Sequence, residues 1–192
     1  MLENLRKKLD LSWIKTNHVW DIVVYGSFAR GKSETRDIDI AVILDRVTSV
    51  KEKMELSQKI RHMISEKKID FDVKIVDMND FLNPGFLARE AILAEGHSIL
   101  KNDYVAERFG FTAIAIIEYR LEGLTSARKK MFYYALQGRK KGTGVLAEKN
   151  GRIISKGVLQ IPVRHYEEIK ALFEQNKVKY KTRFLLQYGI LH

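Results

Sequence analysis

Two short polar elements lie at a fixed distance from each other near the start of the chain. Gly26 and Ser27 follow the apolar run IVVY, and the acidic pair Asp37 and Asp39 comes after nine further residues. A Gly-Ser turn that opens a helix presents backbone N–H groups and the positive end of a helix dipole to an anion. Glycine lets the backbone approach a phosphate closely, and the Ser27 hydroxyl can donate a hydrogen bond. The pair predicts a site for a phosphate chain.

The acidic pair predicts a site for divalent cations beside it. Carboxylates at positions i and i+2 of a strand point to the same face, and Mg²⁺ prefers such oxygen ligands. Asp37 and Asp39 can therefore hold two Mg²⁺ ions about 3.5–4 Å apart, with Mn²⁺ as a substitute. The alternate residues Ile38, Ile40 and Val42 should point into a core on the other face.

Strands and helices with clear patterns surround these residues. The run 19–26 is apolar enough for a strand buried on both faces, and Ser27 suits the N-cap of a short helix ending at Gly31. Further strands are expected at 37–43, 69–76 and, briefly, 97–100. Amphipathic helices are expected at 2–16, at 50–68, and from Pro84 to about residue 94.

The stretch VVYGSFARGKSETRDIDIAVI resembles the signature of the DNA polymerase β-like nucleotidyltransferase superfamily, especially its minimal prokaryotic members. The resemblance covers residues 18–100. It implies an α/β fold of the α+β kind, with a short mixed sheet flanked by helices. It also implies transfer of a nucleoside monophosphate from an NTP, with ATP expected, by a two-metal mechanism that releases pyrophosphate.

The same resemblance implies a third carboxylate on a neighbouring strand. IDFDVKIVD supplies both Asp70 and Asp72, which share a face, so periodicity does not separate them. The family pattern, an acid followed by a short apolar stretch, matches Asp72 better. Its implied role is to complete the site of the ion that activates the acceptor hydroxyl. Asp70 is the alternative, and Asp77, on the opposite face, is expected to cap a helix.

Three cations lie in the loop between the Gly-Ser turn and the acidic pair. Arg30 matches the arginine of the family pattern GSxARG. It can contact the triphosphate or form a salt bridge with the acidic pair. Lys32 and Arg36 flank the same loop and are expected to be solvated, with phosphate contact as the alternative.

The composition excludes several other kinds of site. The sequence has no cysteine, so disulfides, thiolate nucleophiles and cysteine-based zinc sites are excluded. The five histidines form no HxxxH or HExxH pair. No apolar run approaches the roughly 18 residues of a membrane span, and the N-terminus lacks the apolar segment of a secretory signal. A cytoplasmic protein is expected.

The excess of positive over negative charge is confined to the second half of the chain. Residues 1–104 carry 17 Lys and Arg against 17 Asp and Glu, whereas residues 105–192 carry 17 against 7. The whole net charge of +10 therefore belongs to the second half. Such asymmetry favours two modules, one of which faces a polyanion. The alternative is a lysine-rich surface that is simply solvated.

The second half predicts helices and a small αβ unit, and no family is recognised in it. We place a catalytic domain at 1–102 and a basic domain at 103–192. Helices are expected at 103–124, as the connector, and at 126–138. A β-hairpin with its turn at Asn150-Gly151 should follow. A helix from Pro162 to about Gln175 and a final strand complete the chain.

The segment ARKKMFYYALQGRKKGTG is the candidate for binding RNA or DNA. It combines six cations with Phe132, Tyr133 and Tyr134, and basic groups bind phosphates while aromatic rings stack on bases. Met131, Tyr134 and Leu136 also have the spacing of a buried helix face. A capping or dimerisation domain with a solvated basic face is therefore the alternative.

The sequence leaves three classes of acceptor hydroxyl: an RNA end, a protein such as a helical toxin-type partner, or a small molecule. A different functional class is also open. In that alternative the chain is a nucleic-acid-binding or antitoxin-type regulatory protein that keeps the fold without turnover.

Overall fold

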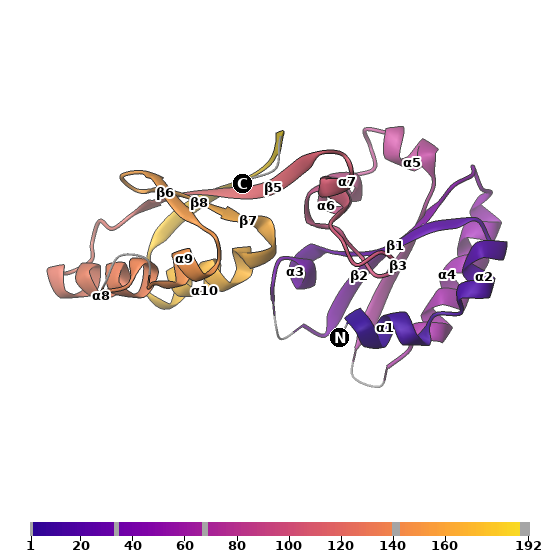
Figure 1. Ribbon diagram of the computed structural model, residues 1–192, viewed down its shortest axis with the longest axis horizontal. Helices are drawn as coiled ribbons and strands as arrows, with labels where there is room; N and C mark the ends of the chain where they lie inside the picture. The colour runs from indigo at the N-terminus through magenta and orange to yellow at the C-terminus, as the bar shows by residue number, and fades with distance from the viewer. Residues whose placement is uncertain (1, 33–34, 67–68, 140–142, 189–192) are drawn as a thin grey trace. The chain divides into compact units, whose positions relative to one another are not determined.

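The computed structural model describes residues 2–32, 35–66, 69–139 and 143–188. The chain divides into two compact units, Met1–Phe109 and Gly110–His192. The sequence-based division after residue 102 stays a prediction, and the units are described separately below (Figure 1).

The first unit is built on a four-stranded mixed sheet of order β3-β2-β1-β4. Strand β1 is antiparallel to both β2 and β4, whereas β2 and β3 are parallel. The elements are α1 (Leu2–Lys8), α2 (Leu11–Thr16), β1 (Val19–Tyr25), α3 (Gly26–Ala29), β2 (Asp37–Leu44), α4 (Val50–Ile64), β3 (Asp70–Val76), α5 (Met78–Leu82), α6 (Ala88–Glu95), β4 (His97–Ser98) and α7 (Val105–Arg108).

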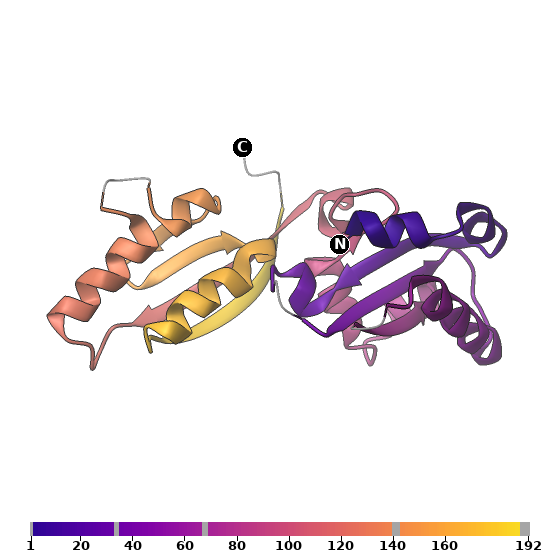
Figure 2. The ribbon, with the colours of Figure 1, turned by 90° about the horizontal axis from the view of Figure 1, so that it is seen from below.

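Both faces of this sheet are covered. One face packs against α1, α2 and α4, with Leu5, Ile14 and Ile60 among the buried residues. The other packs against α6 and α7 through Ile92 and Val105. Figures 1 and 2 show these helices around the strands. The predicted fold class, a short mixed sheet flanked by helices, is confirmed.

Most predicted elements of this unit are present, with differences at their ends. The expected helix 2–16 is interrupted, because the Asp10 side chain caps a new helix by accepting N–H bonds from Ser12 and Trp13. Helix α3 begins at Gly26, so Ser27 lies inside the helix rather than at its N-cap. Pro84 lies before α6 and does not open it.

The second unit is a four-stranded antiparallel sheet of order β6-β7-β5-β8. Three helices, α8, α9 and α10, lie against the same face of this sheet (Figure 1). The elements are β5 (Phe111–Arg120), α8 (Ser126–Gln137), α9 (Val145–Glu148), β6 (Arg152–Ser155), β7 (Val158–Pro162), the 3₁₀ turn η1 (Val163–His165), α10 (Tyr166–Gln175) and β8 (Lys179–Tyr188).

The expected helix over 103–124 is wrong, because only α7 at its start is helical and Phe111–Arg120 form the inner strand β5. Ala115, Ile117 and Tyr119 alternate into the core beneath the helices, and β5 pairs with β7 on one side and β8 on the other. A continuous apolar run does not distinguish a buried strand from a buried helix. Its isoleucines and aromatic residues suit a strand with two neighbours.

The hairpin is present, but its turn is not at Asn150-Gly151. Asn150 has a left-handed φ of +54° and ends α9. The Gly151 N–H donates to the Leu146 carbonyl at 2.7 Å, and the Asn150 N–H donates to the Ala147 carbonyl at 3.1 Å. This is a Schellman ending. The hairpin turn between β6 and β7 instead contains Gly157, whose φ is +78°.

Helix α8 buries a different stripe from the one expected. Phe132 and Leu136 are fully buried in the core of the second unit. Met131 is 66% exposed and Tyr134 is 38% exposed. The expectation that Leu136 lies in the core is confirmed, whereas Met131 and Tyr134 face outward.

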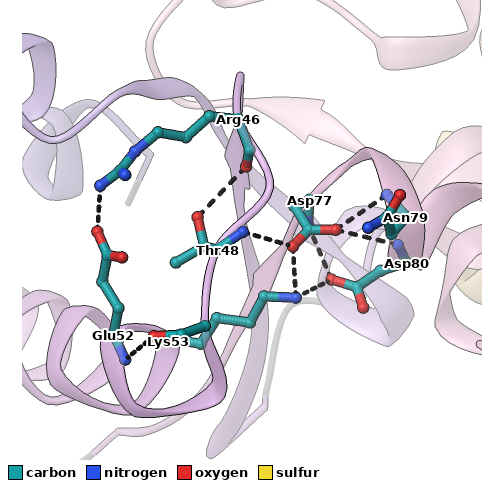
Figure 3. Close-up of polar contacts among 8 residues, drawn as sticks. Arg46, Thr48, Glu52, Lys53, Asp77, Asn79 and Asp80 are labelled. Carbon is teal, nitrogen blue, oxygen red and sulfur yellow. Dashed lines mark hydrogen bonds and ion pairs between the residues drawn. The ribbon is translucent and has the colours of Figure 1, made fainter.

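A polar network joins the far ends of β2 and β3 to the helices that follow them (Figure 3). Lys53 of α4 lies 2.7 Å from both Asp77 Oδ2 and Asp80 Oδ2. Asp77 also accepts the N–H groups of Thr48, Asn79 and Asp80, and it caps α5 as the sequence predicts. The network therefore ties the loop after β2, the start of α4 and the end of β3 together.

Within the described parts of the chain, the structure has no helix with the length and apolar character that a membrane crossing requires.

We expect Lys53→Met to lower the free energy of unfolding by about 1–3 kcal/mol, because it leaves the buried Asp77 carboxylate without its cation. Burial raises the pKa of Asp77, but the Lys53 hydrogen bond and backbone N–H groups outweigh it and leave the pKa below its usual value. The stability that Asp77 adds is therefore present above the unfolded pKa and is lost as the pH falls through the folded pKa.

Urea unfolding at neutral pH measures this loss. The matched control is Arg46→Met, which removes the exposed ion pair to Glu52 in the same network. That change should cost at most about 1 kcal/mol. Equal losses in the two variants would contradict the role given to Lys53.

Candidate functional site

Four carboxylates lie at one end of the first sheet, where β2 and β3 both begin. The parallel register sets Asp37 beside Asp70 and Asp39 beside Asp72. All four share the face that carries Ala41 and Val76 further along the strands, because side chains alternate along a strand. The predicted counterparts on the other face, Ile38, Ile40 and Val42, are fully buried.

Strand β1 brings Gly26 against this acidic edge. Tyr25 is the register partner of Asp39 across the antiparallel pair, so the turn after β1 lies directly beside Asp39. Gly26 has a left-handed φ of +76°. A Cβ atom at this position would lie 2.3 Å from Asp39 Oδ2. Glycine is therefore required both by the backbone and by the place of the Asp39 carboxylate.

A buried carboxylate holds the turn from behind. Glu95, at the end of α6, is 7% exposed. Its Oε2 accepts the Gly26 N–H at 3.0 Å and an Arg30 guanidinium N–H at 2.8 Å. The Gly26 N–H is thus already satisfied, and Arg30 pairs with Glu95 in addition to any charge it shares with the acidic pair. Sequence reasoning missed Glu95, because a single acid at a helix end gives no signal before the fold is known.

Lys74 is a second residue that the sequence analysis missed. Its Nζ lies 3.0 Å from Asp72 Oδ2 and 3.2 Å from the Tyr25 hydroxyl. Lys74 is two residues beyond Asp72 on β3, so alternation places it on the same face. This two-residue spacing could have identified Lys74 from the sequence. The acidic edge therefore carries one cation of its own.

The charges at this edge shift one another's pKa values. Burial raises the pKa of Asp39, and the charge of Asp72 adds to the rise while Lys74 and Arg30 oppose it. Burial tends to lower the pKa of Lys74, but its contacts with Asp72 and Tyr25 outweigh this and leave it raised. Lys74 is therefore protonated at neutral pH.

Asp70 and Asp72 each lie beside one member of the acidic pair, so the strand register allows either as the third carboxylate. Asp72 is the direct neighbour of Asp39 and also lies 3.7 Å from an Arg61 guanidinium N. Asp70 is the neighbour of Asp37 at the start of both strands. In the described part of the chain, no three of these groups converge closely enough to hold one ion together. The sequence-based choice of Asp72 stays a prediction.

The remaining loop residues lie where backbone contacts fix them. The Ser27 carbonyl accepts the Lys32 N–H at 3.1 Å, and the Arg36 carbonyl accepts the Asp70 N–H at 2.7 Å. These bonds close the loop between α3 and β2 at both ends. The phosphate contacts considered for Ser27, Lys32 and Arg36 stay predictions.

We expect Arg30→Met to lower the free energy of unfolding by about 2–4 kcal/mol, because it strands the buried Glu95 carboxylate. Arg61→Met is the matched control, since Arg61 and Asp72 are each about half exposed and 3.7 Å apart. The control should cost less than about 1 kcal/mol. Chemical unfolding of both variants decides the matter, and a neutral Arg30→Met would show that Arg30 has no structural role.

Several solved structures are similar to part of this chain. One is a tri-AMPylated Shewanella oneidensis HEPN toxin in complex with MNT antitoxin. It is 23% identical, with 52% of this chain and 71% of that chain covered and a TM-score of 0.35. Another is a toxin–antitoxin with AMP-PNP, at 23% identity, 49% and 71% coverage and a TM-score of 0.36.

No curated protein matches the sequence. Residues 7–105, just over half of the chain, match the family described as "Polymerase beta, Nucleotidyltransferase". The match covers the sheet of the first unit, the Gly26 turn and all four carboxylates, and it leaves the second unit unassigned. The chain therefore belongs to the polymerase beta nucleotidyltransferase family.

Proposed function

We propose that the first unit transfers a nucleoside monophosphate from an NTP, with ATP as the donor, to an acceptor hydroxyl and releases pyrophosphate. The observation that carries the proposal is the register of β2 and β3, which sets Asp39 beside Asp72 at the edge where the Gly26 turn also ends. The donor phosphates and the metal-binding oxygens would therefore meet at this edge of the sheet.

The residues at this edge have the ligand chemistry of a divalent-cation site, although no three of the described groups converge on one ion position. The donor set consists of hard carboxylate oxygens, which Mg²⁺ and Mn²⁺ prefer, and the ammonium of Lys74 already lies against one of them. Asp37 and Asp39 would hold the ions, and Asp72 would complete the site on the acceptor side. The ions would neutralise the triphosphate and activate the acceptor hydroxyl.

The chain's own groups would bind and orient the donor. The phosphates would lie along the turn after Gly26, where Ser27 can donate from its hydroxyl. Glu95 and Arg30 hold the turn in place from behind. Lys74 orients Asp72 and adds a fixed positive charge near the reacting phosphates. Catalysis would then be positioning combined with charge neutralisation.

The acceptor is the open part of the proposal, with an RNA end, a protein such as a toxin-type partner, and a small molecule as the three classes. The decisive experiment incubates the purified chain with Mg²⁺ and α-labelled NTPs, in turn with total RNA, with cell lysate protein and with small-molecule extracts. Label in one class names the acceptor. Label in none, with ATP left intact, would reject the enzyme.

In the same assay we expect Asp37→Asn, Asp39→Asn and Asp72→Asn each to lower transfer at least about 100-fold, because each removes a ligand of the ions that would neutralise the charge of the transition state. Asp70→Asn is the matched control on the same strand and should retain most of the activity. The reverse result for Asp70 and Asp72 would make Asp70 the third carboxylate.

Thermal unfolding of Asp39→Asn shows whether a loss of transfer reflects misfolding. The raised pKa of Asp39 means that the folded state disfavours its ionised form above the folded pKa. An uncharged amide at this position should therefore leave the melting temperature at pH 7 unchanged or higher. A lower melting temperature would attribute the lost transfer to folding.

Gly26→Ala tests the close approach of the turn to Asp39. Gly110 has nearly the same φ, +75°, but nothing lies within 4 Å of its added Cβ, so Gly110→Ala is the matched control. Both changes should cost about 1–2 kcal/mol of stability through backbone strain. Only Gly26→Ala should reduce transfer, by about 100-fold, because it displaces the Asp39 carboxylate. Equal transfer rates would contradict the role of this contact.

The regulatory alternative has one observation in its favour, which is that Asp72 already forms ion pairs with Lys74 and Arg61. A protein of that kind would bind ATP or nucleic acid without turnover. Calorimetric binding of ATP with no release of pyrophosphate, in the presence of every acceptor class, would select this alternative.

A further inference from the structure

The outward side of α8 gathers positive charge next to exposed apolar surface. Lys130 and Met131 lie four and three residues before Tyr134, and all three lie opposite the buried stripe of Phe132 and Leu136. We call Lys130, Met131, Tyr134 and the following Arg139 the α8 outer face.

Two basic side chains on this face lie over the same aromatic ring, that of Tyr134. Lys130 Nζ lies 5.6 Å from the Tyr134 ring centroid, and the Arg139 guanidinium carbon lies 5.5 Å from the same centroid. Two like charges repel each other, so a shared ring that holds both presents a concentrated positive site to solvent. Both basic side chains are therefore placed at defined positions over the Tyr134 ring.

The chain segment that carries this face contains no acid, and its described basic side chains form no ion pair. Residues 123–147 contain six Lys and Arg and no Asp or Glu. Among the described residues, no ion pair involves Arg128, Lys129, Lys130 or Arg139, whereas on α10 the acids Glu167 and Glu168 pair with Lys170 and Lys149. The second unit thus separates paired charge on α10 from unpaired positive charge on α8.

We propose that the α8 outer face binds single-stranded nucleic acid. Lys130 and Arg139 would contact successive phosphates, and Tyr134 with Met131 would lie against unpaired bases. Base–aromatic stacking tolerates any sequence, and a planar guanidinium on an aromatic ring extends the flat surface. A duplex offers the same phosphates but keeps its bases stacked, so it would use only part of this surface.

This inference does not rest on the proposed transfer reaction, since binding is measured without NTP or metal. The test uses the full chain and fluorescence anisotropy with labelled 20-nucleotide single-stranded RNA, single-stranded DNA of the same sequence, and the matching duplex. Each probe is titrated from low to moderate NaCl concentration. We expect both single strands to bind more tightly than the duplex, and the two arms show whether RNA or DNA is preferred.

The decisive variant is Lys130→Glu combined with Arg139→Glu. It should weaken single-strand binding at least ten-fold, and losing two phosphate contacts should reduce the slope of log K against log salt by about 1.4. The control, Lys179→Glu with Lys181→Glu, makes the same charge change on β8. These residues alternate with Tyr180, which packs under the helices, so they lie on the opposite face of the sheet. The control should change affinity less than three-fold.

Tyr134→Ala with Tyr134→Phe separates stacking from charge. Alanine should weaken single-strand binding about five-fold or more, whereas phenylalanine keeps the ring and should retain the affinity. Melting temperatures verify that each variant is folded. If the α8 double variant and the β8 double variant lose the same affinity for single strands, net charge alone explains the binding and the proposal is overturned. Equal binding of duplex and single strand, or no binding at low salt, would also overturn it.

Discussion

The parallel pairing of β2 with β3 is the constraint on which the rest of the first unit depends. A shift of one residue would turn the carboxylates of one strand into the core and its isoleucines into solvent. The register is secured at its far end by Lys53, which joins α4 to the end of β3 through Asp77 and Asp80. The strand ladder itself sets the acidic edge, and these ion pairs reinforce the other end of the same strands.

The acidic edge is also stabilised by cations that belong to the protein. Four carboxylates on neighbouring strands would repel one another, and Lys74 reduces that repulsion from within the same face. Behind the turn, Glu95 carries a buried negative charge that Arg30 and the Gly26 N–H compensate. The site therefore combines a group of exposed carboxylates with a buried ion pair behind them, and that pair positions the Gly26 turn.

Local signals in the sequence were enough for much of the first unit. The alternation of DIDIAVI predicted both the buried isoleucines and the shared face of Asp37 and Asp39, because one strand contains the whole pattern. Glu95 was not predictable in this way. Its partners lie 65 and 69 residues away, and only the packing of α6 against β1 brings them together.

The second unit shows where such signals are ambiguous. The apolar run of β5 suits a helix or a buried strand equally, and pairing with β7 and β8 decides the outcome. The Met131 and Tyr134 pattern was compatible with a core face, but Phe132 and Leu136 supply that face instead. In each case, contacts with residues from elsewhere in the chain decide which structure forms.

The Schellman ending of α9 has a consequence for the chemical durability of the chain. An Asn-Gly pair ages by deamidation, in which the glycine amide nitrogen attacks the asparagine side chain and closes a five-membered ring. At Asn150 that nitrogen belongs to Gly151, whose N–H is held 2.7 Å from the Leu146 carbonyl. The attack requires this bond to break and α9 to loosen at its end. The same contacts that end the helix therefore slow the isomerisation and charge gain that this dipeptide undergoes in an unfolded chain.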